Sequence, residues 1–176
     1  MRSEYSANAY PPLIDRLVDP RLAAAEAIGP LESFDFEAAV TPQAVADPDM
    51  ARACMSGLWL KHDFLDRSHE ISQRIPSASG SFWHGIMHRR EGDFGNAKYW
   101  FRRVGEHPIF PSLAAAAHAI NSDQFADAQR WDPYDFVDRC AVSAEQNVPH
   151  ATLGEIEAAE WDLLFAYCFQ NAIGVA

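Results

Sequence analysis

The sequence predicts an all-α protein, a helical bundle of six to eight helices that forms one domain over residues 1–176. Apolar residues recur at helical spacing through most of the chain, whereas the alternating pattern of a strand is scarce. Proline and glycine divide the chain into segments of helical length joined by short loops. The chain has 176 residues, 48% of them hydrophobic and 22% charged, which is enough to bury one core. Residues 1–10 are polar and are expected to be a flexible lead-in.

In the first half of the chain, the spacing of apolar residues predicts a short helix over 13–18 and an Ala-rich helix over 22–28. Residues 50–75 are expected to form one long helix or a degenerate pair of helices. Gly29 and Pro30 are expected to end the second of these helices. Asp47 and Asp49 are candidate N-caps of the third. Residues 30–48 carry several prolines and are expected to form a connector with one short helical turn.

In the second half, residues 76–81 have the composition of a loop, and a helix hairpin is expected to follow over 82–105. Pro111 and Pro133 suit the first turns of two further helices, which are expected to end near residues 119 and 146. Thr152 and Glu155 have the spacing of a capping box and predict the start of a last helix.

Charge and cysteine content exclude several classes of function. The net charge of −11 argues against nucleic acid and against an anionic membrane surface as partners, because both would be repelled. No apolar run approaches the ~20 residues needed to span a bilayer, and the N-terminus lacks the pattern of a secretory signal. The three cysteines form no Cys-x-x-Cys pair, so neither a disulfide framework nor a zinc ribbon is indicated. We therefore expect a cytoplasmic protein.

The hairpin segment has a mid-helix glycine, a Gly-Asp-aromatic turn, a small and an aromatic residue in its second helix, and a closing proline: Gly85, Gly92-Asp93-Phe94, Ala97, Phe101 and Pro108. Glycine and alanine allow two antiparallel helices to approach, and the aromatic rings fill the remaining space. In these features residues 78–108 resemble one unit of the tetratricopeptide-repeat family. The resemblance implies a helix hairpin in a protein that binds peptides in a concave groove.

The segment departs from that family where His84 and His88 replace apolar or aromatic residues. No second clean copy of the unit is present, so the chain is expected to be a bundle that uses the same hairpin packing. The wider segment 59–108 also resembles bacterial proteins of unknown function, a resemblance that implies no chemistry. One subgroup of the repeat family clamps a C-terminal carboxylate with Lys, Arg and Asn. The corresponding helix here offers Phe82, Trp83 and Ile86, which does not support that activity.

Two segments each place ionisable residues at i, i+4 and i+7, on one face of an expected helix: His62, Asp66 and His69, and then His84, His88 and Glu91. If the two helices pack antiparallel, we expect three or four of these side chains to converge. Imidazole and carboxylate groups are the usual ligands of zinc, iron and manganese. Glu91 or Asp66, if not bound to the metal, is a candidate catalytic base, and Asp63 and Glu70 are candidate partners that orient the rings.

Two other interpretations compete with a metal site. The histidines can be structural, bonded to nearby carboxylates and covered by a tryptophan. Alternatively, an unusual concentration of basic residues in this acidic chain, Arg89, Arg90, Lys98, Arg102 and Arg103, suits an anion. A small anionic ligand would then be held by His69, His84, His88, Arg89 and Arg102. Pairing of these cations with the chain's many carboxylates is the structural alternative.

The sequence indicates a helical fold more specifically than it indicates any chemistry. The leading expectation is therefore a helical, repeat-like protein that binds a peptide or a small anionic ligand. The second is a metal-dependent enzyme or a metal-binding protein that uses the histidine and carboxylate cluster.

Overall fold

The computed structural model describes residues 10–146 and 150–175, which form ten α-helices and no strand. The all-α class is confirmed, and the expected count of six to eight helices is too low. Two features account for the difference. The segment before residue 48 holds three short helices, α1 (Pro12–Val18), α2 (Ala24–Glu32) and α3 (Phe36–Val40). The segment 50–75 then breaks into two helices.

The N-terminal helices differ from expectation at the end of α2, which continues through Gly29 and Pro30. Its buried residues Ala27 and Leu31 lie on both sides of this dipeptide, so packing maintains the helix where local propensity would end it. Tyr10, the last residue of the expected lead-in, packs edge-on against Phe165 and Phe169. Residues 1–9 lie outside the described part of the chain.

The segment 50–75 forms α4 (Pro48–Lys61) and α5 (Leu65–Ser72). The break between them includes Asp63, which has a φ of 65°. Aspartate is among the few residues that tolerate this left-handed conformation. Asp47 caps α4 as predicted, because its carboxylate accepts hydrogen bonds from the backbone N–H groups of Asp49 and Met50.

The expected hairpin is present as α6 (Ala78–Glu91) and α7 (Phe94–Val104). It begins earlier than predicted, because Ser77 caps α6 through the backbone N–H of Gly80. Gly92 provides the turn with a φ of 87°, and Asp93 caps α7. A Cβ atom on Gly85 would lie 3.1 Å from the Phe101 ring, so the two helices approach closely at this glycine.

The remaining helices are α8 (Phe110–Ile120), α9 (Pro133–Glu145) and α10 (Ala151–Ala172). Pro111 and Pro133 lie in the first turns of α8 and α9, as expected. The predicted capping box is wrong, because α10 begins at Ala151 with His150 as its N-cap and Thr152 lies inside the helix.

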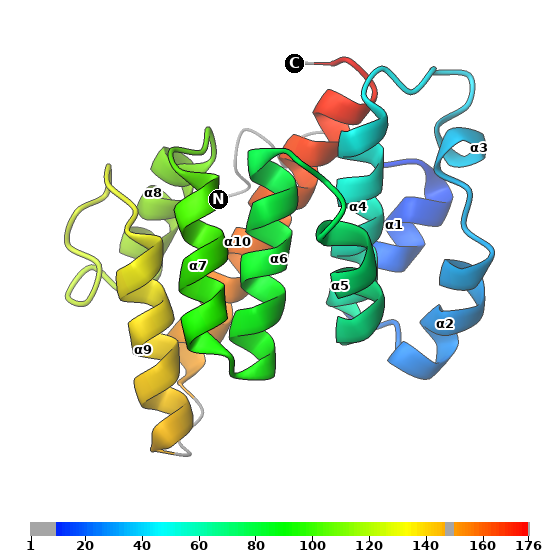
Figure 1. The fold of residues 1–176 in the computed structure, drawn as a ribbon. Coiled ribbons are helices and arrows are strands. Elements are labelled where there is room, and N and C mark those ends of the chain that lie inside the picture. The colour runs from blue at the N-terminus through cyan, green and yellow to red at the C-terminus, as the bar shows by residue number, and fades with distance from the viewer. Residues whose placement is uncertain (1–9, 147–149, 176) are drawn as a thin grey trace.

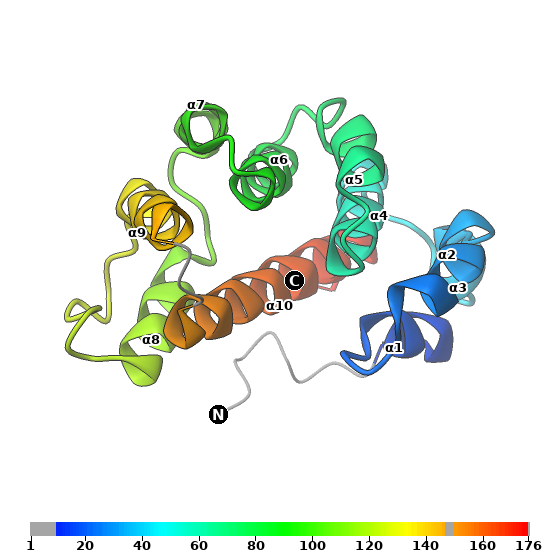
Figure 2. The ribbon, with the colours of Figure 1, turned by 90° about the horizontal axis from the view of Figure 1, so that it is seen from below.

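Helix α10 packs across the successive helix pairs. It contacts α4 and α8, and its Trp161 ring lies 5.9 Å from the Trp83 ring of α6. Figures 1 and 2 show α10 running beside these helices, with α7 on the far side of α6. Half of its 22 residues are buried. No helix in the described part of the chain is long and apolar enough to span a membrane.

Candidate metal site

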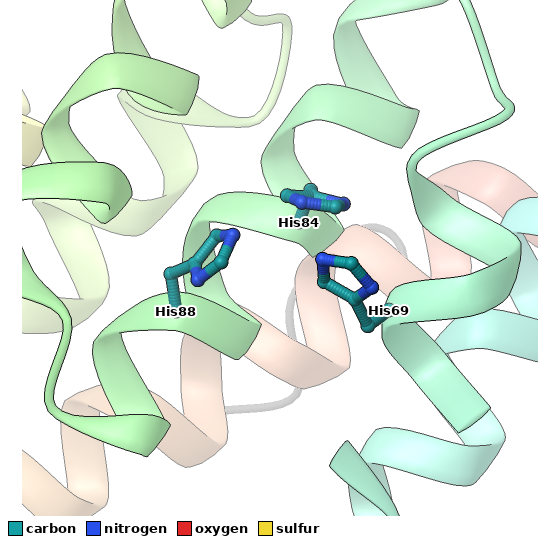
Figure 3. Close-up of side chains that lie close together, drawn as sticks. All are labelled: His69, His84 and His88. Carbon is teal, nitrogen blue, oxygen red and sulfur yellow. The ribbon is translucent and has the colours of Figure 1, made fainter. Parts of the chain in front are cut away.

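Three histidine side chains from two helices meet beside α7: His69 from α5, and His84 and His88 from α6. One ring nitrogen from each residue lies within 4.8 Å of the nitrogens of the other two. The centroid of the His69 ring lies 4.6 Å from that of the His84 ring and 5.5 Å from that of the His88 ring. Figure 3 shows the three rings turned toward one another between the two ribbons. We call these residues the histidine triad.

Local sequence explains why the two helices meet here. His84 and His88 are four residues apart and therefore lie on one face of α6. The connection from α5 to α6 is short, and a Cβ atom on Gly80 would lie 2.5 Å from the side chain of Ile75. Glycine at this position allows the connection to fold tightly, which brings α5 alongside α6 and His69 opposite the two other histidines.

The triad is largely enclosed. His84 and His88 are buried, and His69 is partly buried. The Trp100 ring of α7 lies over His84, with ring centroids 4.0 Å apart. The guanidinium of Arg103 lies 5.1 Å from the centre of the Trp100 ring. Trp100 therefore covers one side of the His84 ring, at an angle of 43° between the two ring planes.

Burial keeps the imidazoles of His84 and His88 uncharged. Burial, together with the neighbouring His88 and His69, lowers the pKa of His84 to about 3. Burial also lowers the pKa of His88, although the Glu91 carboxylate opposes that shift. A neutral imidazole is the form that binds a metal, so these two rings are in a binding-competent state at neutral pH.

The Nδ1 atoms of two triad rings have polar partners. Ser72 Oγ lies 2.9 Å from His84 Nδ1, and Glu91 Oε2 lies 3.1 Å from His88 Nδ1. The Asn96 amide nitrogen is 3.5 Å from the same His88 atom. The predicted orienting residues have other partners, since Asp63 pairs with Arg90 and Glu70 with Arg67. Sequence reasoning missed Ser72, although its i, i+3 spacing from His69 on α5 was a usable signal.

Two of the six predicted ligands lie apart from the triad. His62 is buried at the end of α4, where its Nε2 lies 2.8 Å from the carbonyl oxygen of Leu17. Asp66 is exposed in the first turn of α5 and does not belong to the cluster. The expected single face of His62, Asp66 and His69 is wrong, because the helix breaks between residues 61 and 65.

Glu91 and the basic residues also differ from expectation. Glu91 is exposed and reaches the triad only through Nδ1 of His88. Arg89 is buried and ion-paired with Glu160 of α10, so it does not share an anion site with the triad. Arg90 bonds to the Leu60 carbonyl oxygen and to Asp63, and Lys98 pairs with Asp138.

Of the predicted anion-binding cations, Arg102 is exposed on α7. The carboxylate-pairing interpretation is thus confirmed for Arg89, Arg90 and Lys98. Comparisons of the chain with protein-family models, curated proteins and solved structures found no match. The geometry of the histidine triad is therefore the basis for assigning a function.

Proposed function

We propose that this protein binds a divalent transition metal ion through His69, His84 and His88. The observation that supports the proposal is the approach of three imidazole nitrogens to within 4.8 Å of one another. Around a tetrahedral ion with metal–nitrogen bonds of about 2.0–2.1 Å, such nitrogens lie about 3.3 Å apart. Small rotations of the three side chains, which draw the nitrogens together by roughly 1.5 Å at most, would complete the site.

The donor set indicates which ions fit. Three neutral nitrogen donors suit zinc or iron(II) better than manganese, which prefers oxygen ligands. Three protein ligands also leave one position open to water or to a substrate, the arrangement of catalytic rather than structural zinc sites. A metal bound there would supply an activated water molecule, so hydrolysis is the reaction class we assign to the site.

The peptide-binding and anion-binding hypotheses rank second. Helix α10 packs along α4 and α8 and contacts α6 (Figure 2). It therefore occupies the side of these helices on which a peptide-binding groove would lie. Arg89, the cation best placed to bind an anion, already forms an ion pair with Glu160. The triad instead offers three ring nitrogens that can ligate a metal, and none of its three residues is a carboxylate.

The test is a zinc and iron(II) titration of protein purified without a histidine tag, combined with elemental mass spectrometry. We expect the wild-type protein to bind one equivalent of metal. H84A should bind the metal about 100-fold or more weakly, because one of three ligands is lost. The H150A variant is the matched control, since His150 is an exposed histidine at the start of α10. It should bind metal as the wild type does.

Thermal unfolding of both variants shows whether the fold survives. If the wild-type protein binds neither ion, or if folded H84A retains wild-type affinity, the proposed site is wrong. H88A provides a second variant in case H84A fails to fold.

A further inference from the structure

The two triad residues on α6 each have a polar group at Nδ1, and these groups determine where the ring protons lie. A carboxylate at neutral pH accepts hydrogen bonds and cannot donate them. Glu91 Oε2 lies 3.1 Å from Nδ1 of His88, so that nitrogen carries the hydrogen. Asn96 is farther away, at 3.5 Å, and uncharged, and therefore competes weakly.

The contacts of Ser72 allow the same tautomer at His84. The Ser72 hydroxyl has one hydrogen. Its oxygen lies 3.4 Å from the backbone carbonyl of His69, which can only accept, and 2.9 Å from Nδ1 of His84. If the hydroxyl donates to that carbonyl, Nδ1 of His84 donates to the hydroxyl. Ser72 thus links the backbone of one triad residue to the ring of another.

We infer that Glu91 and Ser72 hold His88 and His84 as Nδ1–H tautomers, which assigns Nε2 of both rings as the metal-binding atoms. The inference rests on the proposed metal site and changes the expected part of Glu91. Its carboxylate is a positioning group behind His88 and not a ligand. A ring that donates through one nitrogen to a fixed acceptor is held in orientation and binds a metal more strongly through the other.

His69 differs from the other two residues. Among the described residues, its ring has only the neighbouring imidazoles as ring contacts and no hydrogen-bond partner. The site therefore consists of an oriented pair on α6 and an adjustable third ligand on α5. Metal binding would tie α5 to α6 through His69.

The experiment combines two measurements on wild type, E91A and E91Q. In the metal-free protein, long-range proton–nitrogen NMR of the ring nitrogens reports each tautomer directly. We expect Nδ1–H forms at His84 and His88 in the wild type. His88 should shift toward the Nε2–H form in E91A and remain Nδ1–H in E91Q, because a glutamine oxygen still accepts the hydrogen bond.

Zinc competition titrations provide the second measurement. E91A should bind zinc about 10–100-fold more weakly than the wild type, and E91Q should recover most of that loss. The E70Q variant is the control, since Glu70 is an exposed carboxylate on α5 that pairs only with Arg67. It changes the net charge as E91Q does and should leave zinc affinity unchanged. S72A extends the test to His84, with an expected loss of about 10-fold.

The outcomes separate the two proposals. A wild-type protein that binds no zinc overturns the proposed function, and with it the role of Glu91 in positioning a metal ligand. A wild-type protein that binds zinc while E91A binds equally well overturns the inference alone. An Nε2–H tautomer at His88 in the metal-free protein overturns it as well.

Discussion

Two faces of α6 bury polar side chains, and they do so differently. His88 and Arg89 are adjacent in sequence and therefore point to different sides of the helix. On the side of α10, Arg89 makes two hydrogen bonds to the Glu160 carboxylate and lies 4.7 Å from the centre of the Phe136 ring. On the side of α5, three imidazoles face one another with no carboxylate among them.

On the face of α6 that carries Arg89, which we call the Arg89 side, a carboxylate of the chain balances the buried charge. Burial alone would lower the pKa of Arg89, but Glu160 and Glu157 raise it above its ordinary value. Burial raises the pKa of the Glu160 carboxyl, and the guanidinium opposes that rise. With two charge-assisted hydrogen bonds between them, the two groups form an ion pair at neutral pH. Such a pair holds α6 to α10 and requires no added ion.

The triad side places two oriented imidazoles opposite a third, so spare nitrogen acceptors come together in a buried setting. Whether a buried polar group is structural or binds a ligand therefore depends on what remains unpaired after the chain's own hydrogen bonds are counted. Arg89 makes two hydrogen bonds to Glu160, and its buried Nε, which has no hydrogen bond, lies 3.4 Å from Glu157 Oε1, so its charge is balanced within the chain and the pair is a structural element. The triad has nitrogens left for a cation, which is why we propose a binding site there.

The largest effect we expect is on the Arg89 side. Replacing Glu160 by glutamine leaves the buried guanidinium without its main counter-charge and should reduce the free energy of unfolding by about 3–5 kcal/mol. Urea unfolding measures the loss. E155Q, at an exposed position on the same helix, should change stability by less than about 0.5 kcal/mol.

The same variant tests whether the two faces are independent. Folded E160Q should bind zinc with wild-type affinity, because Glu160 does not contact the triad. A loss below about 1 kcal/mol would show that Glu157, 3.4 Å from Arg89 Nε, already supplies the counter-charge. A parallel loss of zinc affinity would show that the faces are coupled.

The sequence predicted the all-α class, the hairpin and the pairing of His84 with His88, because these depend on local periodicity and turn residues. It left open whether residues 50–75 form one helix or two, and it did not place the break at Asp63, which adopts a left-handed conformation inside an otherwise helical pattern. That break removed His62 from the site, whereas Asp66 lies on the same helix as His69 but is exposed. The ion pair of Arg89 with Glu160 joins residues 71 positions apart, and spacing along one helix carries no information about such a partner.

A smaller effect concerns His107, a buried histidine outside the triad. His107 lies near the start of α6, where its Nε2 is 3.1 Å from Ser79 Oγ, and burial lowers its pKa to about 4. Because the unfolded chain binds this proton near pH 6.5, the stability that His107 contributes is complete above pH 6.5. It is lost as the pH falls toward 4. At pH 4.5 the loss should be about 2.5 kcal/mol.

Urea unfolding at pH 7 and pH 4.5 measures this loss. H107Q, in which the side chain does not titrate, should lose about 2.5 kcal/mol less than the wild type between these two values. The loss that remains in H107Q belongs in large part to His84, whose pKa burial lowers to about 3. Equal losses in H107Q and in the wild type would assign the whole acid response to other groups.

The smallest effect concerns the packing that places Trp100 over the triad. A Cβ atom on Gly85 would lie 3.1 Å from the ring of Phe101, the residue that follows Trp100 on α7. In G85A that contact costs roughly 1–3 kcal/mol, which offsets a gain of about 1 kcal/mol in helix propensity. We expect a net loss of about 1 kcal/mol and a zinc affinity lower by a few fold, because α7 must move away from His84.

Gly154 provides the matched control, since it lies in α10 with no atom within 4 Å of an added Cβ. G154A should therefore show only the propensity gain and stabilise the protein by about 0.5–1 kcal/mol. If both variants stabilise the protein equally, Phe101 accommodates the added methyl group without cost. Close approach of α6 and α7 would then not be what holds Trp100 against His84, and contacts of Trp100 itself, including that with Arg103, would have to do so.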